Sequence, residues 1–340
     1  MIFFLLIGMT VIVLLLEFAV APRAPRHLLL RYTFDTQLAE PGETVTFSGR
    51  LINNWLFPVT YFNLFESMPE GAEVAGASNG WTEHCLFLLP RRSFAHTVPF
   101  TLPRRGVYRR GRYYLETGDF LGFRTRVTSG EILTDITVMP KLCEDEPILR
   151  VLGGYLGDVS VRRYLMEDPV LTVGYREYTG REPMKKISWK YSAKAGKLMV
   201  RNSDFTADYN VAVVLNMASG TDAEKEKCLE IVRTVCEALE RERIPYQFLS
   251  NGDAGNLEEG FGKKHVERLL TNLGRSNLFC GSSFGSLAER CIRERKRNRS
   301  FIIVSAPLSP AERDALALLQ RYSEHELCVL EAEVDRDAAD

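Results

Sequence analysis

The sequence lacks the patterns that most directly assign a functional class. Its seven cysteines contain no C-x-x-C pair, and its formal net charge of −1 leaves no surplus of basic residues. An odd, scattered set of cysteines is poor evidence for a disulfide framework or a zinc site. The missing basic surplus argues against a nucleic-acid partner. We expect reduced thiols in a cytosolic body.

Catalytic and phosphate-binding patterns are also scarce. No Walker A loop is present, so any ATP hydrolysis has to come from a partner. The five histidines (His27, His84, His96, His265 and His325) show no metal-ligand spacing. The sequence therefore indicates no catalytic residue, metal or cofactor, and we expect a protein that is not an enzyme.

A long hydrophobic run at the start is the clearest positive feature. Residues 1–20 carry a single charge, Glu17. About 20 apolar residues cross a hydrocarbon core as a helix, so we expect a single-pass anchor in the cell membrane. A cleaved signal peptide and a buried core helix are the alternatives. Arg23, Arg26 and Arg31 follow the run and no basic residue precedes it, which by the positive-inside rule places the body in the cytoplasm.

Residues 28–140 have the pattern of a β-sandwich domain. Val45, Phe47 and Leu51 alternate with polar residues, with the period of two of a half-buried strand. Turn signals recur at Pro41-Gly42, Asn53-Asn54, Pro69-Glu70-Gly71, Asn79-Gly80 and Ser129-Gly130. Several short strands with turns at such spacing predict a sandwich.

A group of arginines surrounds Gly106-Val107-Tyr108, which we predict to be a turn. Its members are Arg104, Arg105, Arg109, Arg110 and Arg112. Such a group can protect a strand edge by its charge, which we favour, or contact anionic lipid near the anchor.

Residues 207–334 change to alternating strands and helices. Short apolar runs predict strands at residues 211–215, 246–249, 301–304 and 327–330, and helices are predicted at 286–297 and 310–322. Thr221 and Glu224 form a capping box. One helical face follows it, with Leu229, Val232, Val235, Cys236 and Leu239. This alternation predicts a doubly wound α/β domain.

Residues 141–206 connect the two domains and contain an unusual mixture of aromatic and basic residues. The mixture comprises Tyr175, Tyr178, Trp189 and Tyr191 with Arg176, Lys185, Lys186, Lys190, Lys194, Lys197 and Arg201. Aromatic and basic residues together can bind single-stranded nucleic acid. Because the chain as a whole is not basic, we favour an interdomain clasp or a protein-docking surface.

Four short motifs follow one another in this segment. They are Arg176-Glu177-Tyr178, Ile187-Ser188-Trp189-Lys190, Ser192-Ala193-Lys194 and Leu198-Met199-Val200. A fifth, Asp119-Phe120-Leu121-Gly122-Phe123, follows a predicted strand. Together they resemble the signature of the bacterial domain-of-unknown-function family numbered fifty-eight. The chain departs from that signature at Arg181 and Glu182, where the family has Gly-Asp, and at Lys185, where it has Arg.

The resemblance covers nearly the whole chain and implies both a fold and a partner. Members of the family have a C-terminal half similar to a von Willebrand factor A domain, and they usually carry two membrane spans where this chain has room for one. They are associated with MoxR-type AAA+ ATPases in systems implicated in the maturation or assembly of other proteins. We therefore expect a membrane-anchored adaptor whose partners are the lipid bilayer, a MoxR-type ATPase and other membrane proteins.

The resemblance also implies where an A domain would bind a divalent metal. The positions that match the metal ligands of a von Willebrand factor A domain are Asn216, Ala218, Gly220, Ser283 and Ser305. None of them is a carboxylate, and magnesium prefers several oxygen ligands that include carboxylates. We expect a degenerate site without metal. A metal-dependent A domain that captures a protein ligand is the alternative.

Gly281-Ser282-Ser283-Phe284-Gly285 matches the G-x-S-x-G nucleophile elbow of hydrolases. Asp314 and His325 follow in the order that a triad with Ser283 would need. The resemblance already accounts for the same segment as a loop of the A-type fold. A serine hydrolase is therefore the weaker alternative.

Overall fold

The computed structural model describes residues 2–15, 18, 21–74, 80–109, 111–119, 124–165, 172–180, 184, 187–203, 210–294, 299–322 and 327–334. The chain divides into two compact units, Met1–Lys141 and Leu142–Asp340. The division falls at the end of the predicted sandwich.

The first unit begins with the helix α1 (Ile2–Leu15) and the short 3-10 helix η2 (Ala21–His27). Within the described part of the chain, no helix has both the length and the hydropathy to span a membrane. Residues 1, 16, 17, 19 and 20 of the predicted anchor lie outside the described residues. The anchor therefore stays a prediction.

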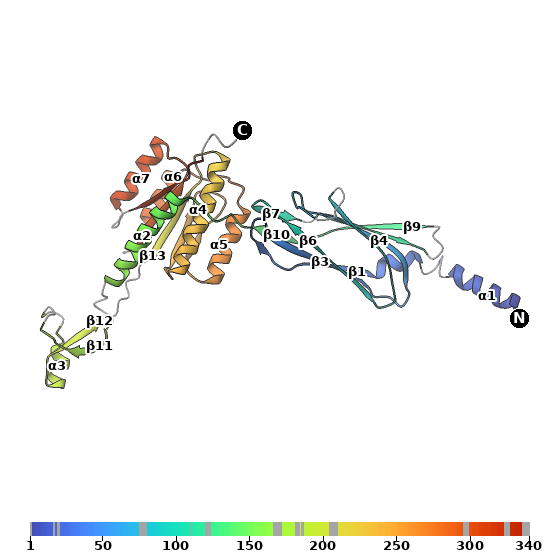
Figure 1. Ribbon diagram of the computed structural model, residues 1–340, viewed down its shortest axis with the longest axis horizontal. Coiled ribbons are helices and arrows are strands. Elements are labelled where there is room, and N and C mark those ends of the chain that lie inside the picture. Colours follow the sequence, from blue (N-terminus) through green and yellow to red (C-terminus); the bar gives the residue numbers. More distant parts are fainter. Residues whose placement is uncertain are drawn as a thin grey trace. The chain divides into compact units, whose positions relative to one another are not determined.

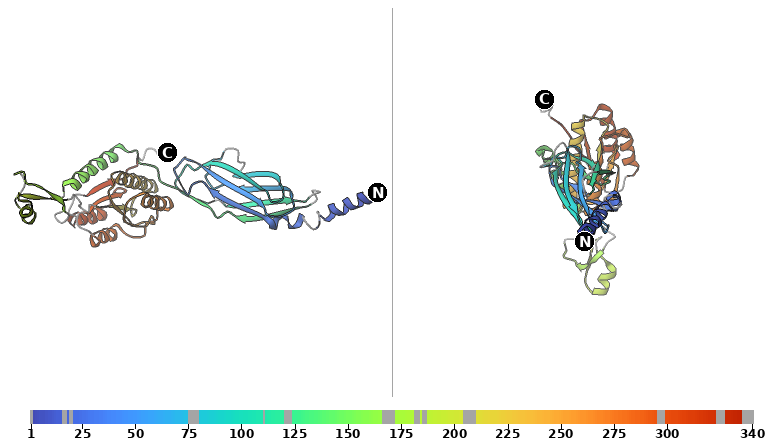
Figure 2. Two further views of the ribbon diagram at one scale, coloured as in Figure 1. Left: turned by 90° about the horizontal axis from the view of Figure 1, so that it is seen from below. Right: turned by 90° about the vertical axis from the view of Figure 1, so that its right-hand side faces the viewer.

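The rest of this unit is a β sandwich. One layer is the antiparallel sheet β5-β4-β8-β9, formed by Trp81–Leu88, Val59–Ser67, Arg112–Gly118 and Thr125–Glu131. The opposite layer contains β1-β3-β6, formed by Leu28–Phe34, Thr44–Asn53 and Ser93–Thr101. A third small sheet, β2-β10-β7, is formed by Leu38–Ala39, Asp135–Val138 and Gly106–Arg109. Figure 2 shows these strands as facing layers.

The sandwich core follows from the alternation along its strands. Val45, Phe47 and Leu51 of β3 are all buried, as their spacing predicts. Leu51 packs with Phe62 and Leu64 of β4, so the two main sheets share an apolar interior. The β-sandwich prediction is confirmed at this level.

Two predicted turns of the sandwich are wrong. Gly130 lies inside β9, opposite Tyr113 of β8, where a Cβ atom would approach the Tyr113 ring to 2.5 Å. The glycine here permits close approach of a ring rather than a turn. Gly106 and Tyr108 lie in β7, which stands at the end of its sheet. Arg109 is the last residue of this edge strand, Arg104 and Arg105 directly precede it, and Arg112 begins the inner strand β8 of the other sheet. Arg110 lies outside the described residues, so a shared role for the group stays a prediction.

The second unit is built on the five-stranded sheet β15-β14-β13-β16-β17. Its strands are Leu257–Gly260, Tyr246–Ser250, Asn210–Asn216, Arg299–Ser305 and Cys328–Glu331. The strands β13, β14, β16 and β17 are parallel, and β15 is an antiparallel edge strand. All seven residues of β13 are buried, as expected for a parallel strand covered on both faces.

Helices cover both faces of this sheet (Figure 1). One face packs against α2 (Glu146–Leu165), α4 (Asp222–Arg241) and α5 (Lys263–Arg275). The other packs against α6 (Phe284–Arg293) and α7 (Pro310–Tyr322). The unit is thus a doubly wound α/β domain. The capping box of Thr221 and Glu224 is confirmed at the start of α4.

The helix α2 lies in the segment that the sequence treats as a connection. Ile148, Leu152 and Val159 are buried in the core of the α/β sheet. The backbone N–H of Cys143 also donates to Thr234 Oγ1 of α4 at 2.9 Å. The first part of residues 141–206 is therefore a layer of the α/β domain and not a linker.

Candidate functional site

The family-signature residues form a small structure of their own, which we call the signature segment (residues 172–203). It contains β11 (Thr172–Glu177), α3 (Trp189–Ala195) and β12 (Met199–Ser203). The two strands pair antiparallel from Thr172 opposite Ser203 to Glu177 opposite Met199. Just beyond β11, the backbone N–H of Tyr178 donates to the carbonyl of Leu198 at 2.9 Å and continues the pairing.

Part of the signature holds α3 against β12. Ile187 is buried and bridges Val200. Ser192 is also buried, and its Oγ accepts a hydrogen bond from the backbone N–H of Met199 at 2.8 Å. The helix ends at Gly196, whose φ of 68° is the left-handed conformation common at helix C-termini. These residues serve as the frame of the segment.

Several other residues of the segment are exposed, and we call Arg176, Trp189, Lys190, Tyr191 and Lys194 the exposed set, whereas Tyr178 of the signature is half-buried. Trp189 is 61% exposed and Tyr191 43% exposed. The Tyr191 ring stacks on Tyr175 with 3.6 Å between centroids, which fixes its orientation. Glu177 is also exposed, and it forms an ion pair with Lys197. The sequence therefore mixes a buried frame with a solvent-facing aromatic and basic surface.

The other predicted signature positions do not belong to the described part of this segment. Arg181, Glu182, Lys185 and Gly122 lie outside the described residues. Asp119 is described and lies in the sandwich unit, directly after β8. It is buried, and its carbonyl accepts a hydrogen bond from Thr60 Oγ1 at 3.2 Å.

A second group of predicted residues lies at the carboxyl ends of β13 and β16. The strand order reverses between these two strands, and open α/β sheets bind ligands at such a switch point. Asn216 ends β13 and is the register partner of Ser305, which ends β16. Both residues are buried, and Ser305 Oγ has no hydrogen-bond partner. Two of the five predicted metal positions therefore meet at the switch point.

A network of hydrogen bonds fills this switch point. Asn216 Nδ2 donates to Glu312 Oε1 at 2.7 Å, and Asn251 Nδ2 donates to Asn216 Oδ1 at 2.8 Å. Ser219 Oγ donates to Glu312 Oε1 at 3.1 Å. The second carboxylate oxygen of Glu312 accepts from the backbone N–H and the Oγ of Ser309, at 2.8 and 2.6 Å.

Glu312 is the residue that the sequence reasoning missed. No predicted position has a carboxylate, yet the fold brings this one in from the first turn of α7. Burial by itself raises the pKa of Glu312, but the hydrogen bonds from Ser309, Asn216 and Ser219 outweigh it and hold the pKa below its ordinary value. Because both oxygens already accept hydrogen bonds from the protein, and one carboxylate suits magnesium poorly, the residues present do not fit a magnesium site.

The other predicted metal positions have local roles. Ala218 is exposed, and its backbone N–H donates to Asn216 Oδ1 at 3.1 Å. Gly220 has a φ of +93°, and a Cβ there would approach the Cβ of Ala306 to 2.3 Å, so only glycine fits. Ser283 is exposed and forms the N-cap of α6.

The structure also bears on the hydrolase alternative. Ser283 Oγ accepts a hydrogen bond from the backbone N–H of Ser286 at 3.3 Å, and its φ of −68° is ordinary extended backbone. A nucleophile elbow instead has a strained turn that exposes the serine. Asp314 is an exposed residue of α7, and His325 lies outside the described residues. The local geometry is that of a helix cap.

Comparisons with known proteins add little to this geometry. No family model matches the chain, and no curated protein matches it. The CARDB domain of the PF1109 protein from Pyrococcus furiosus, solved in complex with di-metal ions, is 14% identical over 33% of this chain and 91% of that chain, with a TM-score of 0.22. A native alpha-2-macroglobulin fragment from Escherichia coli is 15% identical over 34% of this chain and 17% of its own, with a TM-score of 0.27. TM-scores this low carry no argument about function.

Proposed function

We propose that this chain is a non-enzymatic, membrane-anchored adaptor that docks a MoxR-type AAA+ ATPase and works with it in protein maturation or assembly. The observation that carries the proposal is the exposed set of the signature segment. A tryptophan that is 61% exposed stands beside exposed lysines on α3, which the buried Ser192 joins to β12 through the backbone N–H of Met199.

The chemistry of the exposed set suits recognition of a protein surface. Tryptophan, tyrosine and arginine dominate the binding energy of most protein interfaces. The stacking of Tyr191 on Tyr175 orients one ring before binding, so less side-chain entropy is lost on association. Lys190 and Lys194 add positive charge, which complements an acidic patch on the partner and raises the rate of encounter.

The switch point supports the non-enzymatic part of the proposal. Glu312 is held there by four hydrogen bonds from Asn216, Ser219 and Ser309, so it is not a free acid or base. The anchor predicted in residues 1–20 would confine the docking surface to the membrane, where a client membrane protein is also found. The family resemblance supplies the identity of the ATPase.

Co-purification with the MoxR-type ATPase of the same organism tests the proposal. The intact chain is extracted in detergent, and recovery of the ATPase is compared between the unmodified chain and Trp189→Ala. We expect Trp189→Ala to reduce the recovered ATPase about tenfold or more, as loss of an interface hot spot does. Phe261→Ala is the matched control, because Phe261 is 60% exposed and lies in the α/β domain outside the signature segment.

Two results would overturn the proposal. The first is recovery of the unmodified chain without the ATPase after crosslinking. The second is an equal loss of recovery in Trp189→Ala and Phe261→Ala, which would show that no specific surface is involved.

A further inference from the structure

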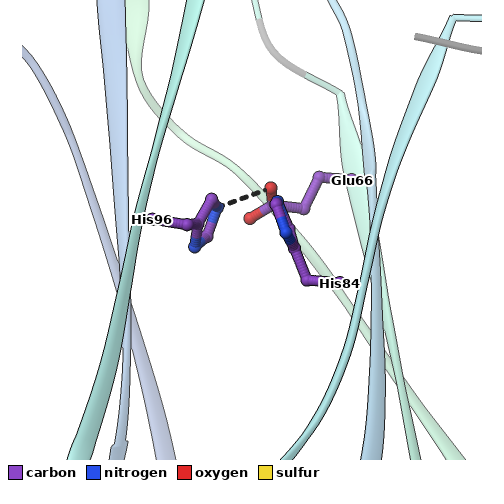
Figure 3. A group of neighbouring side chains, drawn as sticks. All are labelled: Glu66, His84 and His96. Atoms are coloured by element: carbon purple, nitrogen blue, oxygen red, sulfur yellow. Dashed lines mark hydrogen bonds and ion pairs between the residues drawn. The ribbon is translucent and has the colours of Figure 1, made fainter. Parts of the chain in front are cut away.

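Three potential metal ligands meet inside the sandwich, each from a different strand. Glu66 lies on β4, His84 on β5 and His96 on β6, and their ligand atoms all lie within 4.8 Å of one another. The strands β4 and β5 belong to one sheet, whereas β6 belongs to the facing sheet. Figure 3 shows the carboxylate and the two imidazole rings turned toward one another between the sheets.

Strand register explains why these side chains share the interior. His84 is the partner of Leu64, two residues from Glu66, so both chelating side chains project from the same face of their sheet. On β6, His96 alternates with the buried Val98 and Phe100 and therefore faces inward as they do. The fold thus joins two histidines that show no ligand spacing in the sequence.

The space for His96 depends on the strand beside it. Gly49 of β3 is the register partner of His96, and a Cβ at position 49 would approach Cε1 of the His96 ring to 2.2 Å and Nε2 to 2.6 Å. The missing side chain at position 49 therefore lets the imidazole lie against the neighbouring strand with its Nε2 directed to Glu66. The position of the His96 ring is therefore determined by the glycine of the neighbouring strand.

The cluster places ionisable side chains beside the buried apolar residues of the sandwich, and Thr82 Oγ1 also donates to Glu66 Oε2 at 3.4 Å. Glu66 is fully buried, and His96 Nε2 lies 2.8 Å from Glu66 Oε2. His96 Nδ1 is buried without a hydrogen-bond partner. The Phe94 ring stacks on His96, with 5.5 Å between centroids, and lies 5.8 Å from the ring of His84. A carboxylate in such surroundings is costly unless strong partners compensate for its lost hydration.

We propose that Glu66, His84 and His96 bind one divalent transition-metal ion, with Zn²⁺ as the best match. The ion takes the place of the proton shared by His96 Nε2 and Glu66 Oε2, and His84 supplies the third ligand. Zn²⁺ accepts imidazole nitrogen and carboxylate oxygen at about 2.0–2.2 Å, which puts tetrahedral ligand atoms about 3.3 Å apart. Small side-chain adjustments bring the present cluster to that spacing.

The ligand types decide which metal fits. Two imidazoles with one carboxylate suit zinc and its neighbours, whereas magnesium and calcium prefer oxygen ligands. Because His84 is only half-buried, the ion can enter from its side, and a water molecule can complete the coordination there. An ion at this position connects β4 and β5 to β6 of the opposite sheet, so it stabilises the sandwich.

Metal titration of the full purified chain tests this proposal. After treatment with EDTA, Zn²⁺ is added and binding is followed by calorimetry and by the thermal unfolding midpoint. We expect one ion per chain and a higher midpoint. Glu66→Gln and His84→Gln should each weaken binding at least about tenfold. Co²⁺ in place of Zn²⁺ gives a visible spectrum that reports tetrahedral nitrogen and oxygen ligands without thiolate.

Control variants separate this cluster from other zinc-binding groups. Cys85→Ser removes an exposed thiol next to His84, and His27→Asn removes an exposed imidazole outside the cluster. Both variants should bind Zn²⁺ with the affinity and stoichiometry of the unmodified chain. Circular dichroism checks folding of each variant, and His84→Gln decides the question if the buried Glu66→Gln does not fold.

The proposal is overturned if the unmodified chain binds no Zn²⁺ or Co²⁺ at micromolar concentrations. Undiminished binding in folded His84→Gln would overturn it as well, as would a Co²⁺ spectrum with thiolate bands that Cys85→Ser removes. Since the proposed docking surface lies on the signature segment, loss of metal binding leaves the ATPase proposal standing.

Discussion

Asn216 Nδ2 donates a hydrogen bond to Glu312 Oε1 at 2.7 Å, across 96 positions of sequence. The bond joins the last residue of β13 to the first turn of α7. Asn251, directly after β14, donates in turn to Asn216 Oδ1. Three chain segments at the switch point are thereby held in one hydrogen-bonded network, which makes Glu312 a central residue of the α/β domain.

Replacement of Glu312 should destabilise the α/β domain. Glu312→Ala leaves the donors of the buried Asn216 and the half-buried Ser309 without their acceptor, and we expect the free energy of unfolding to fall by about 2–3 kcal/mol. Urea unfolding measures the change. Glu289→Ala, at an exposed position of α6, is the control and should change the free energy by less than about 0.5 kcal/mol. Equal effects of the two substitutions would contradict the role of Glu312.

Acid pH should weaken the same network. The pKa of Glu312 is lowered in the folded chain, so its contribution to stability is complete above the pKa of an unfolded glutamate, about 4.3, and is lost as the pH falls through the folded pKa. Urea unfolding between pH 7 and pH 3 measures this loss. Glu312→Gln should reduce the loss of unfolding free energy at acid pH. The same loss in that variant as in the unmodified chain would mean that other carboxylates cause it.

Gly220→Ala should be strongly destabilising. The new Cβ would lie 2.3 Å from the Cβ of Ala306, and the backbone would keep a φ of +93°. Steric overlap and backbone strain together should lower the free energy of unfolding by about 2–4 kcal/mol. Gly255→Ala is a matched control, since its φ is +72° and its nearest neighbour would be 3.7 Å away. That variant has strain alone and should lose about 1–2 kcal/mol. Thermal unfolding of both variants separates the two effects.

Ser283→Ala should affect a helix cap and not a reaction. Loss of the hydrogen bond to the backbone N–H of Ser286 should lower the free energy of unfolding by about 1 kcal/mol. Ser282→Ala, at the exposed neighbouring position, should have little effect. We also expect a fluorophosphonate probe to leave the chain unlabelled. Labelling that disappears in Ser283→Ala would instead support the serine hydrolase.

Alkaline pH should lower stability through the buried thiols. Burial raises the pKa of Cys228 to about 12 and those of Cys291 and Cys328 to about 11. Above the pKa of an unfolded thiol, about 8.5, the unfolded chain loses protons that the folded chain keeps, so stability falls as the pH rises. The slope is up to about 1.4 kcal/mol per pH unit for each thiol.

Urea unfolding between pH 8 and pH 10 tests the thiol prediction. Cys228→Ala should reduce the slope of stability against pH. Cys85→Ser should leave it unchanged, because Cys85 is exposed. A slope that is the same in all three proteins would assign the alkaline loss to groups other than these thiols.

The sequence predicts well those elements whose signal is local. The strand β13 is a continuous apolar run because both of its faces are covered, and α4 begins at a capping box followed by an apolar face. Other elements have no such signal. The helix α2 contains Gly153, Gly154 and Gly157, and glycine has a low helix propensity, so the sequence does not predict a helix there. The N-cap of α5 is Gly262, with no side chain to cap the helix.

The site residues that the sequence missed depend on pairing across the fold. Glu312 lies in the first turn of α7, where the helix dipole alone favours an acidic residue. Its position in the sequence therefore does not mark it as part of a site. His84 and His96 lie on strands of different sheets, and their proximity depends on how those sheets face each other. Alternation does give one usable signal, because it places the polar His96 among inward apolar residues of β6.

The pairing of Thr172 with Ser203 brings the two ends of the signature segment next to each other. Paired residues of antiparallel strands have Cα atoms about 4.5–5.5 Å apart. A short glycine bridge can therefore replace the whole segment without pulling on α2 or β13. Deletion or exchange of the whole segment therefore leaves the chain connected from α2 to β13, and the sheet of the α/β domain needs no rearrangement.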